Sequence, residues 1–223
     1  MTTEPQRRSR AALERHARVS KAIKIEALLS AMTPIHRLPI HEDGTGAGYI
    51  AAHFASHVGS GGEVWAVNVF DQCQIHEDFF FELVRDTQLP FPDEPFDIRT
   101  SNHLLEYVGT RESQIAPLRE IRPVLEATGW LYVALPNCWI LIEPHFNLAL
   151  LSWLPRSQRD RYLRLAGRGN HYDCDPPSHA ELEALPLEAD LDPREVSVDG
   201  IKAVAQLEHG PGLRRSLLRH PEP

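Results

Sequence analysis

The residues with the clearest chemistry are an acidic side chain and three glycines at every second position: Glu42, Gly44, Gly46 and Gly48. Glycine lets the backbone turn tightly, and it lets a ligand approach where any side chain would clash. A helix that starts after such a loop points its free N–H groups at whatever lies over the loop. Many nucleotides bind at a glycine loop between a strand and a helix, so the loop alone leaves its ligand open.

The apolar pattern around the loop predicts the elements that hold it. Residues 37–41 are expected to form a first strand and residues 48–58 a helix with one apolar face. Residues 63–70 read as a second, parallel strand that is covered on both faces. Together they predict a βαβ unit with a right-handed crossover, and residues 79–84 are a further strand candidate.

Asn68 stands where such a unit usually holds the ribose of its ligand, about 20 positions beyond the glycines at the end of the second strand. Aspartate or glutamate is more common there, because a carboxylate accepts both ribose hydroxyls in charge-assisted bonds. An amide offers one acceptor oxygen, so the expected loss of binding free energy is on the order of 1 kcal/mol. Asp71 is an alternative ligand, and Asn68 as a simple turn former is another.

Three later segments occur in a characteristic order after the loop. They read LPFPDEPFD over 89–97, LREIRPVL over 118–125 and WLYVALPN over 130–137. With the acidic-x-Gly-x-Gly-x-Gly loop, they make residues 36–185 resemble the type 11 group of class I S-adenosylmethionine-dependent methyltransferases. Dinucleotide-binding oxidoreductases usually carry G-x-G-x-x-G in this loop. The glycines of this chain lack that spacing, which disfavours a Rossmann oxidoreductase.

The resemblance implies an α/β, Rossmann-like class I methyltransferase fold, with a central, mostly parallel seven-stranded sheet flanked by helices. It implies S-adenosylmethionine as cofactor, with the glycines under its methionine end, Asn68 at the ribose and Asp86 or Thr87 near the adenine. The cofactor-binding residues implied in this way are Glu42, Gly44, Gly46, Gly48, Asn68, Asp86, Thr87 and Ser101.

Several positions depart from the family pattern. His41 and Asp43 stand where apolar residues are usual, Arg99 interrupts the fourth strand, and Thr128 lies in a turn that is usually Pro-Gly-Gly. These changes and Asn68 leave an alternative open. In that alternative the chain is a catalytically weak or inactive relative that serves as a binding or partner subunit.

Methyl transfer from a sulfonium is an in-line displacement that needs positioning and no protein nucleophile. A hydroxyl acceptor must lose a proton, however, and histidine has a suitable pKa for that task. His103 and His145 are the candidate catalytic bases, with Glu106, Tyr107 and Glu143 in reserve. A structural, hydrogen-bonded role is the alternative for each histidine.

Metal binding is disfavoured on the sequence. His53 and His57 are four residues apart on one expected helix, but no third ligand is evident. The polar run 171–175 has no partner motif and reads as a solvated turn. Three widely spaced cysteines, Cys73, Cys138 and Cys174, suggest a reducing compartment.

Charge and composition narrow the partners. A net charge of −8 argues against nucleic acid, and no apolar run is long enough for a membrane span. We expect a cytoplasmic protein with a small-molecule acceptor, and a homodimer stays open. Aromatic residues suggest that the acceptor is partly apolar, namely Trp139, Phe146 and Trp153.

The expected organisation has three parts. Residues 1–35 form a helical extension, residues 36–209 the methyltransferase domain with a covering insertion at about 138–178, and residues 210–223 a loosely ordered tail. Within the domain, residues 196–205 are expected to supply the last antiparallel strands. Ser178 and Glu181 are three residues apart and predict a capping box at a helix start.

Overall fold

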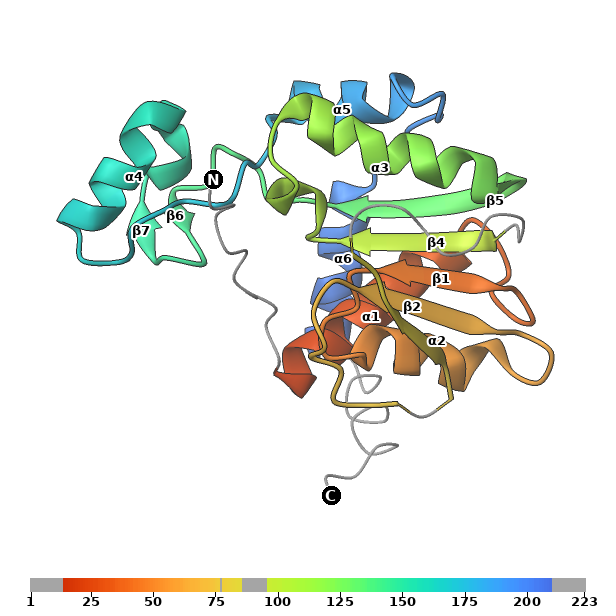
Figure 1. Ribbon diagram of the computed structural model, residues 1–223. Coiled ribbons are helices and arrows are strands. Elements are labelled where there is room, and N and C mark those ends of the chain that lie inside the picture. Colours follow the sequence, from red (N-terminus) through yellow and green to blue (C-terminus); the bar gives the residue numbers. More distant parts are fainter. Residues whose placement is uncertain (1–13, 77, 86–95, 210–223) are drawn as a thin grey trace. The chain divides into compact units, whose positions relative to one another are not determined.

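A computed structural model describes residues 14–76, 78–85 and 96–209. The chain divides into two compact units, each of which is considered by itself. The sheet unit consists of the described residues of Ala11–Asn102, Pro123–Val133 and Arg194–Pro223, and the helical unit of His103–Arg122 and Ala134–Pro193. Figure 1 shows the elements of both units.

The sheet unit is built on one five-stranded sheet with the order β3-β2-β1-β4-β5 (Figure 1). Its first strand, β1, pairs in parallel with β2 and with β4, and β2 pairs in parallel with β3. The predicted βαβ unit and the predicted strand over 79–84 are therefore confirmed. The strands are β1 Ile40–Asp43, β2 Val64–Asn68, β3 Phe80–Leu83, β4 Phe96–Asn102 and β5 Leu125–Ala134.

Three helices belong to the sheet unit: α1 Arg15–Ser30, α2 Tyr49–Val58 and α6 Ser197–His209. Helix α1 contacts both α2 and α6. Ile25 of α1 and Phe54 of α2 are fully buried, and so are Ile40 and Ile98, which are register partners on β1 and β4. Apolar residues in the centre of a parallel sheet are what helical cover on its faces requires.

The prediction of strands over 196–205 is wrong, because this segment lies in and just before α6. Its less exposed positions are Val196, Gly200 and Ala203, which is the i, i+4, i+7 spacing of a helix face. Helix α6 contacts α1, and a Cβ at Gly200 would lie 3.8 Å from Leu28 Cδ1, which is an ordinary van der Waals distance. Within the described ranges the sheet thus has five strands and not the seven that were expected.

The turn that was expected at Glu126–Gly129 is also not formed, because these residues belong to β5. Helix α3, Arg111–Val124, leads directly into β5, and Thr128 and Gly129 lie within that strand. A Cβ at Gly129 would lie only 3.0 Å from the Asp97 carbonyl oxygen. This close approach to β4 explains why a glycine is needed there.

The helical unit contains short elements around a small apolar core. They are η1 Leu105–Tyr107, the start of α3, the antiparallel pair β6 Ile142–Glu143 and β7 Leu148–Ala149, η2 Leu151–Trp153, α4 Arg156–Leu165 and α5 His179–Leu187. The core residues are Phe146, Leu151, Leu163, Tyr172 and Cys174. Phe146 is thus a core residue, whereas Trp139 and Trp153 are 60% and 45% exposed.

The predicted capping box is confirmed at the start of α5. The Ser178 hydroxyl accepts from the Glu181 backbone N–H at 3.3 Å, and the Glu181 carboxylate accepts from the Ser178 backbone N–H at 2.7 Å. Helix α3 lies beside the end of α5, where Arg111 pairs with Glu188. None of the helices in the described ranges is long and apolar enough to cross a bilayer.

Candidate functional site

The glycine loop connects β1 to α2 as the sequence predicts. Gly44, Gly46 and Gly48 have φ values of 72°, 60° and 85°, a region that only glycine enters without strain. Helix α2 begins at Tyr49, directly after the third glycine. The alternation of glycines is therefore explained by the backbone conformation of the loop.

Gly48 has a second reason to be glycine. A Cβ at this position would lie 2.7 Å from Cys73 Sγ and 3.1 Å from the Ile75 carbonyl oxygen. The backbone N–H of Gln74 also donates to the Ala47 carbonyl at 3.1 Å. The segment after β2 thus folds onto the third glycine, and the contact that excludes a side chain there comes from the protein itself.

Glu42 is buried at the end of β1, with 2% of its surface exposed. Its Oε2 accepts a hydrogen bond from the Thr45 hydroxyl at 2.6 Å. Burial raises the pKa of Glu42 to about 7, although the Thr45 hydrogen bond and the positive charge of Arg18 act in the opposite direction. The carboxyl group therefore titrates near neutral pH, where a nearby ammonium group would favour its ionised form.

Asn68 ends β2, as the spacing predicts, and is 8% exposed. Its amide nitrogen donates to the Phe70 carbonyl at 2.8 Å, which leaves the amide oxygen as the group for a ribose hydroxyl. Asp71, the alternative, is exposed. Asp86 and Thr87 lie outside the described residues, so their predicted place near the adenine stays a prediction.

The carboxyl end of β4 carries buried polar groups. Ser101 is 1% and Asn102 5% exposed. Within the described part of the chain, the Ser101 hydroxyl and both polar atoms of the Asn102 side chain have no hydrogen-bond partner. Buried groups of this kind usually have one, so the end of β4 is suited to a polar ligand. Ser101 was predicted here, and its neighbour Asn102 offers two further groups.

The three departures at His41, Asp43 and Arg99 form one buried network between β1 and β4. His41 and Arg99 are register partners, and the Arg99 guanidinium donates to His41 Nδ1 and to Asp43 Oδ1, each at 2.9 Å. Because His41 Nδ1 accepts, the imidazole is neutral, and burial lowers its pKa to about 4. The departures thus partner one another in part, whereas Asp43 Oδ2 and the Nε and Nη1 atoms of Arg99 are buried without a hydrogen-bond partner among the described residues.

His145 lies in the helical unit, in a chain of three hydrogen-bonded side chains. Its Nδ1 is 2.6 Å from Glu143 Oε1, and its Nε2 is 2.6 Å from the Tyr107 hydroxyl. Glu143 is 2% exposed, and its other oxygen accepts from the Phe146 backbone N–H at 2.8 Å. The structure therefore brings one predicted base together with two of the reserve residues.

His103 has a similar partner. It follows β4 directly, with a φ of 58°, and its Nδ1 is 3.2 Å from Glu106 Oε1. Glu106 is fully buried, and its Oε2 has no hydrogen-bond partner among the described residues. Both candidate histidines thus belong to the helical unit and are each held by a buried carboxylate.

A cavity of about 650 Å³ lies in the same unit. Arg111, Arg156 and Arg159 contribute positive charge to its lining, and Asp175 pairs with the last two. The indole rings of Trp139 and Trp153 also line it and meet edge to face, with centroids 5.5 Å apart. Its volume is within the range of small-molecule sites.

A comparison with known families identifies the kind of domain that contains the glycine loop. The sequence profile of the methyltransferase domain family matches residues 41–133, from β1 to β5. This chain carries a methyltransferase domain. The resemblance found in the sequence is confirmed, and S-adenosylmethionine is the cofactor of this domain. No curated protein sequence matches the chain.

Solved structures share the methyltransferase fold. An S-adenosylmethionine-dependent methyltransferase from Mesorhizobium loti is 16% identical, with a TM-score of 0.56 over 89% of this chain and 94% of that chain. A Haloferax volcanii methyltransferase in complex with the activator Trm112 is 19% identical, with a TM-score of 0.53 over 82% and 78%. This chain spans only 50% of the CcbJ methyltransferase of Streptomyces caelestis, and that match, at 20% identity and a TM-score of 0.44 over 53% of this chain, does not bear on the fold.

The residues of the methyltransferase domain fit its cofactor. Glu42 supplies a carboxyl group that titrates near pH 7 beside the glycine loop. The buried, unpartnered groups of Ser101 and Asn102 supply a donor and acceptor set at the neighbouring strand end. Ligands in open α/β sheets bind outside the carboxyl ends of the strands. Glu42 lies one residue before the end of β1, Asn68 ends β2, and Asn102 ends β4.

Proposed function

We propose that this methyltransferase transfers a methyl group to a hydroxyl oxygen of a small molecule, with His145 as general base. The observation that carries the proposal is the hydrogen-bonded chain Glu143–His145–Tyr107. A buried carboxylate that accepts from Nδ1–H leaves a lone pair on Nε2. In the structure this lone pair already faces a hydroxyl, that of Tyr107.

When bound, S-adenosylmethionine supplies a methyl carbon attached to a positively charged sulfur. His145 Nε2 would accept the proton of the acceptor hydroxyl, directly or through the Tyr107 hydroxyl. The acceptor oxygen would take the methyl group as the bond between the methyl carbon and sulfur breaks, and S-adenosylhomocysteine would be the leaving group. The imidazolium that results is stabilised by Glu143, which is held in place by the Phe146 backbone N–H. No covalent bond to the protein is needed.

For the cofactor, we propose the roles that the sequence implies. Glu42 holds the ammonium group of the methionine end, the backbone of Gly44 and Gly46 lies beneath it, and the Asn68 amide oxygen accepts from a ribose hydroxyl. The Ser101 hydroxyl binds a polar group of the methionine end. The supporting observations are the burial of Glu42 and the unpartnered hydroxyl of Ser101.

The cavity of the helical unit suggests the kind of acceptor. Trp139 and Trp153 offer aromatic faces, and Arg111, which pairs with Glu188 in the structure, would exchange that partner for an anionic group on the same molecule. A small hydroxylated molecule with an apolar body and a carboxylate or phosphate would satisfy both. This proposal agrees with the partly apolar acceptor that the sequence suggests.

The test uses methyl-labelled S-adenosylmethionine and a panel of hydroxylated small molecules, with S-adenosylhomocysteine formation as readout. Once an acceptor is found, His145→Ala should lower turnover by roughly 10²–10⁴-fold and leave cofactor affinity unchanged. His103→Ala tests the second candidate base in the same way. His171→Ala is the matched control, because His171 is an exposed histidine that also pairs with a carboxylate, Asp160.

Two results would overturn the proposal. If turnover is unchanged in both His145→Ala and His103→Ala, neither histidine is the base. If the protein binds S-adenosylmethionine but methylates only amines, the hydroxyl target is wrong. A protein that binds the cofactor and methylates no small molecule would favour the alternative of a partner subunit. The Haloferax volcanii relative, in complex with its activator, is an example of a methyltransferase that assembles with a second protein.

A further inference from the structure

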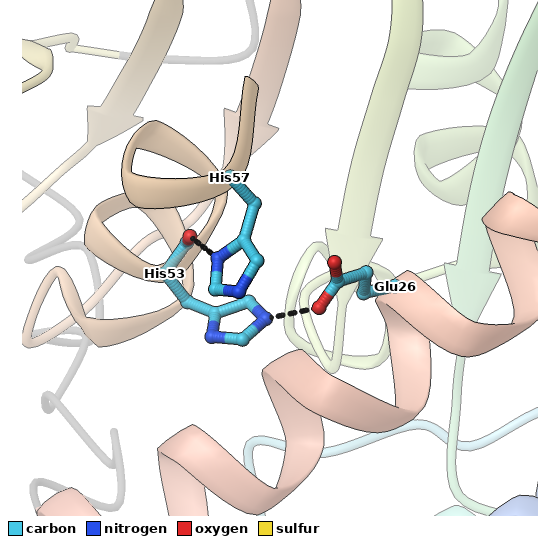
Figure 2. Close-up of side chains that lie close together, drawn as sticks. All are labelled: Glu26, His53 and His57. Atoms are coloured by element: carbon cyan, nitrogen blue, oxygen red, sulfur yellow. Dashed lines mark hydrogen bonds and ion pairs between the residues drawn. The ribbon is translucent and has the colours of Figure 1, made fainter. Parts of the chain in front are cut away.

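Three side chains of the sheet unit meet between α1 and α2, apart from the glycine loop (Figure 2). His53 Nε2 lies 2.6 Å from Glu26 Oε2, and the imidazole rings of His53 and His57 have centroids 4.3 Å apart. One ligand atom from each of the three residues lies within 4.8 Å of the other two. The third ligand that was not evident in the sequence is thus supplied by α1.

The hydrogen bonds of His57 fix which of its nitrogens is available. Its Nδ1 lies 2.7 Å from the His53 carbonyl oxygen, and a carbonyl can only accept, so Nδ1 carries the proton. The lone pair is therefore on Nε2. A backbone carbonyl that orients a histidine in this way is the usual second contact of a metal-ligating imidazole.

The cluster is partly enclosed and still accessible. The His53 side chain is 4% exposed and that of Glu26 22%, while His57 is half-buried. The short hydrogen bond between His53 Nε2 and the Glu26 carboxylate favours the ionised form of Glu26. An ionised carboxylate and two imidazoles make a ligand set with one negative charge, suited to a divalent ion.

We propose that Glu26, His53 and His57 form a binding site for a divalent transition-metal ion, with Zn²⁺ as the best match. Zn²⁺ takes two imidazole nitrogens and a carboxylate oxygen at about 2.0–2.2 Å, and a water fills the fourth position. On binding, the proton shared between His53 Nε2 and Glu26 leaves for solvent. The carboxylate moves back by roughly 0.8 Å, since tetrahedral ligand atoms lie about 3.4 Å apart at these bond lengths.

Such an ion would fasten α1 to the methyltransferase domain. Glu26 comes from α1, which precedes the domain in sequence, and both histidines come from α2, the helix that follows the glycine loop. The bound ion would therefore raise the free energy of unfolding, by an amount that grows with the logarithm of the free ion concentration above its Kd. The site does not depend on the proposed base or acceptor.

A second cluster, Glu143, His145 and Cys174, also has metal-ligand spacing. Its histidine already uses both nitrogens, toward Glu143 and Tyr107. Burial raises the pKa of the Cys174 thiol far above its usual range, so a metal ion would displace the thiol proton at a greater cost in binding free energy than at an exposed cysteine. The cluster between α1 and α2 is therefore the better metal site.

The test is the binding of Zn²⁺, and of Co²⁺ as a spectroscopic probe, to the full chain after treatment with a chelator. Calorimetry should give one Zn²⁺ per chain. His57→Ala and Glu26→Gln should each weaken binding by at least about 10-fold. Both residues lie near the surface, and the fold can be verified by circular dichroism. The Co²⁺ form should show visible bands without a thiolate-to-cobalt charge-transfer band.

His179→Ala is the matched control, because His179 pairs with Glu183 one turn along α5 but has no second histidine beside it. It should bind Zn²⁺ like the unchanged protein, and Zn²⁺ should raise the Tm of both but not that of His57→Ala. The proposal is overturned if His57→Ala binds Zn²⁺ as tightly as the unchanged protein. It is equally overturned if binding is lost in Cys174→Ser and kept in Glu26→Gln, or if no Zn²⁺ binds.

Discussion

Glu42→Gln should stabilise the ligand-free protein above pH 7. The pKa of Glu42 rises from 4.5 to about 7 through burial, so the folded chain binds more protons than the unfolded chain between these values. Stability from this group is fully present below pH 4.5 and is lost as the pH rises through 7. At about 1.4 kcal/mol per pKa unit, the loss amounts to about 3 kcal/mol.

His41 changes the stability with pH in the opposite direction, over nearly the same pH range. Its pKa falls from 6.5 to about 4, so the unfolded chain binds more protons, and stability is lost as the pH falls below 6.5. The magnitude is again about 3 kcal/mol. The two neighbours therefore compensate in the unchanged protein, and Glu42→Gln should expose the His41 slope, with stability that falls steadily from pH 6.5 toward pH 4.

The assay is urea unfolding of the ligand-free protein at several pH values, followed by far-ultraviolet circular dichroism. Gln can still accept from the Thr45 hydroxyl, so packing is conserved. Glu82→Gln is the control, because Glu82 is exposed on β3 of the same sheet, and the substitution should have no effect. If Glu42→Gln has the same pH profile as the unchanged protein and no gain at pH 8, the burial argument is refuted.

Three further predictions concern other parts of the fold. Arg99→Met should lower the free energy of unfolding by about 3–5 kcal/mol, because it leaves Asp43 buried without its ion pair. Urea unfolding tests this prediction. The double variant Arg99→Met with Asp43→Leu should recover part of the lost stability. Asn68→Asp should tighten S-adenosylmethionine binding about fivefold in calorimetry. It should also destabilise the ligand-free protein by about 1 kcal/mol, because the hydrogen bond to the Phe70 carbonyl is lost. Ser178→Ala should cost about 1 kcal/mol, visible as faster amide exchange at the start of α5, and an unchanged exchange rate would contradict the role of the capping box.

Local patterns predicted the features that depend on neighbours in sequence. The strand–loop–helix around Gly44–Gly48 and the capping box at Ser178 are confirmed, because glycine spacing and capping residues act over a few positions. The pattern over 196–205 misled, because a short apolar run does not distinguish a strand from a helix face.

Contacts between distant residues could not be predicted in the same way. Arg99 and His41 are 58 positions apart, Tyr107 and His145 are 38 apart, and His53 and Glu26 are 27 apart. In the sequence alone, Arg99 and His41 only depart from the family pattern, Tyr107 is only a reserve candidate for the base, and His53 belongs to an incomplete metal site. The parallel register of β1 with β4 brings Arg99 to His41, and the packing of α1 on α2 brings Glu26 to His53. Tyr107 and His145 meet through the fold of the helical unit.

The most direct test of the central claim is calorimetric titration of the full chain with S-adenosylmethionine, S-adenosylhomocysteine and NAD. The account predicts that one molecule of each of the first two binds per chain, with an affinity that Glu42→Gln lowers, and that NAD does not bind. Absence of binding of the first two at millimolar concentration would contradict the account, as would tight binding of NAD.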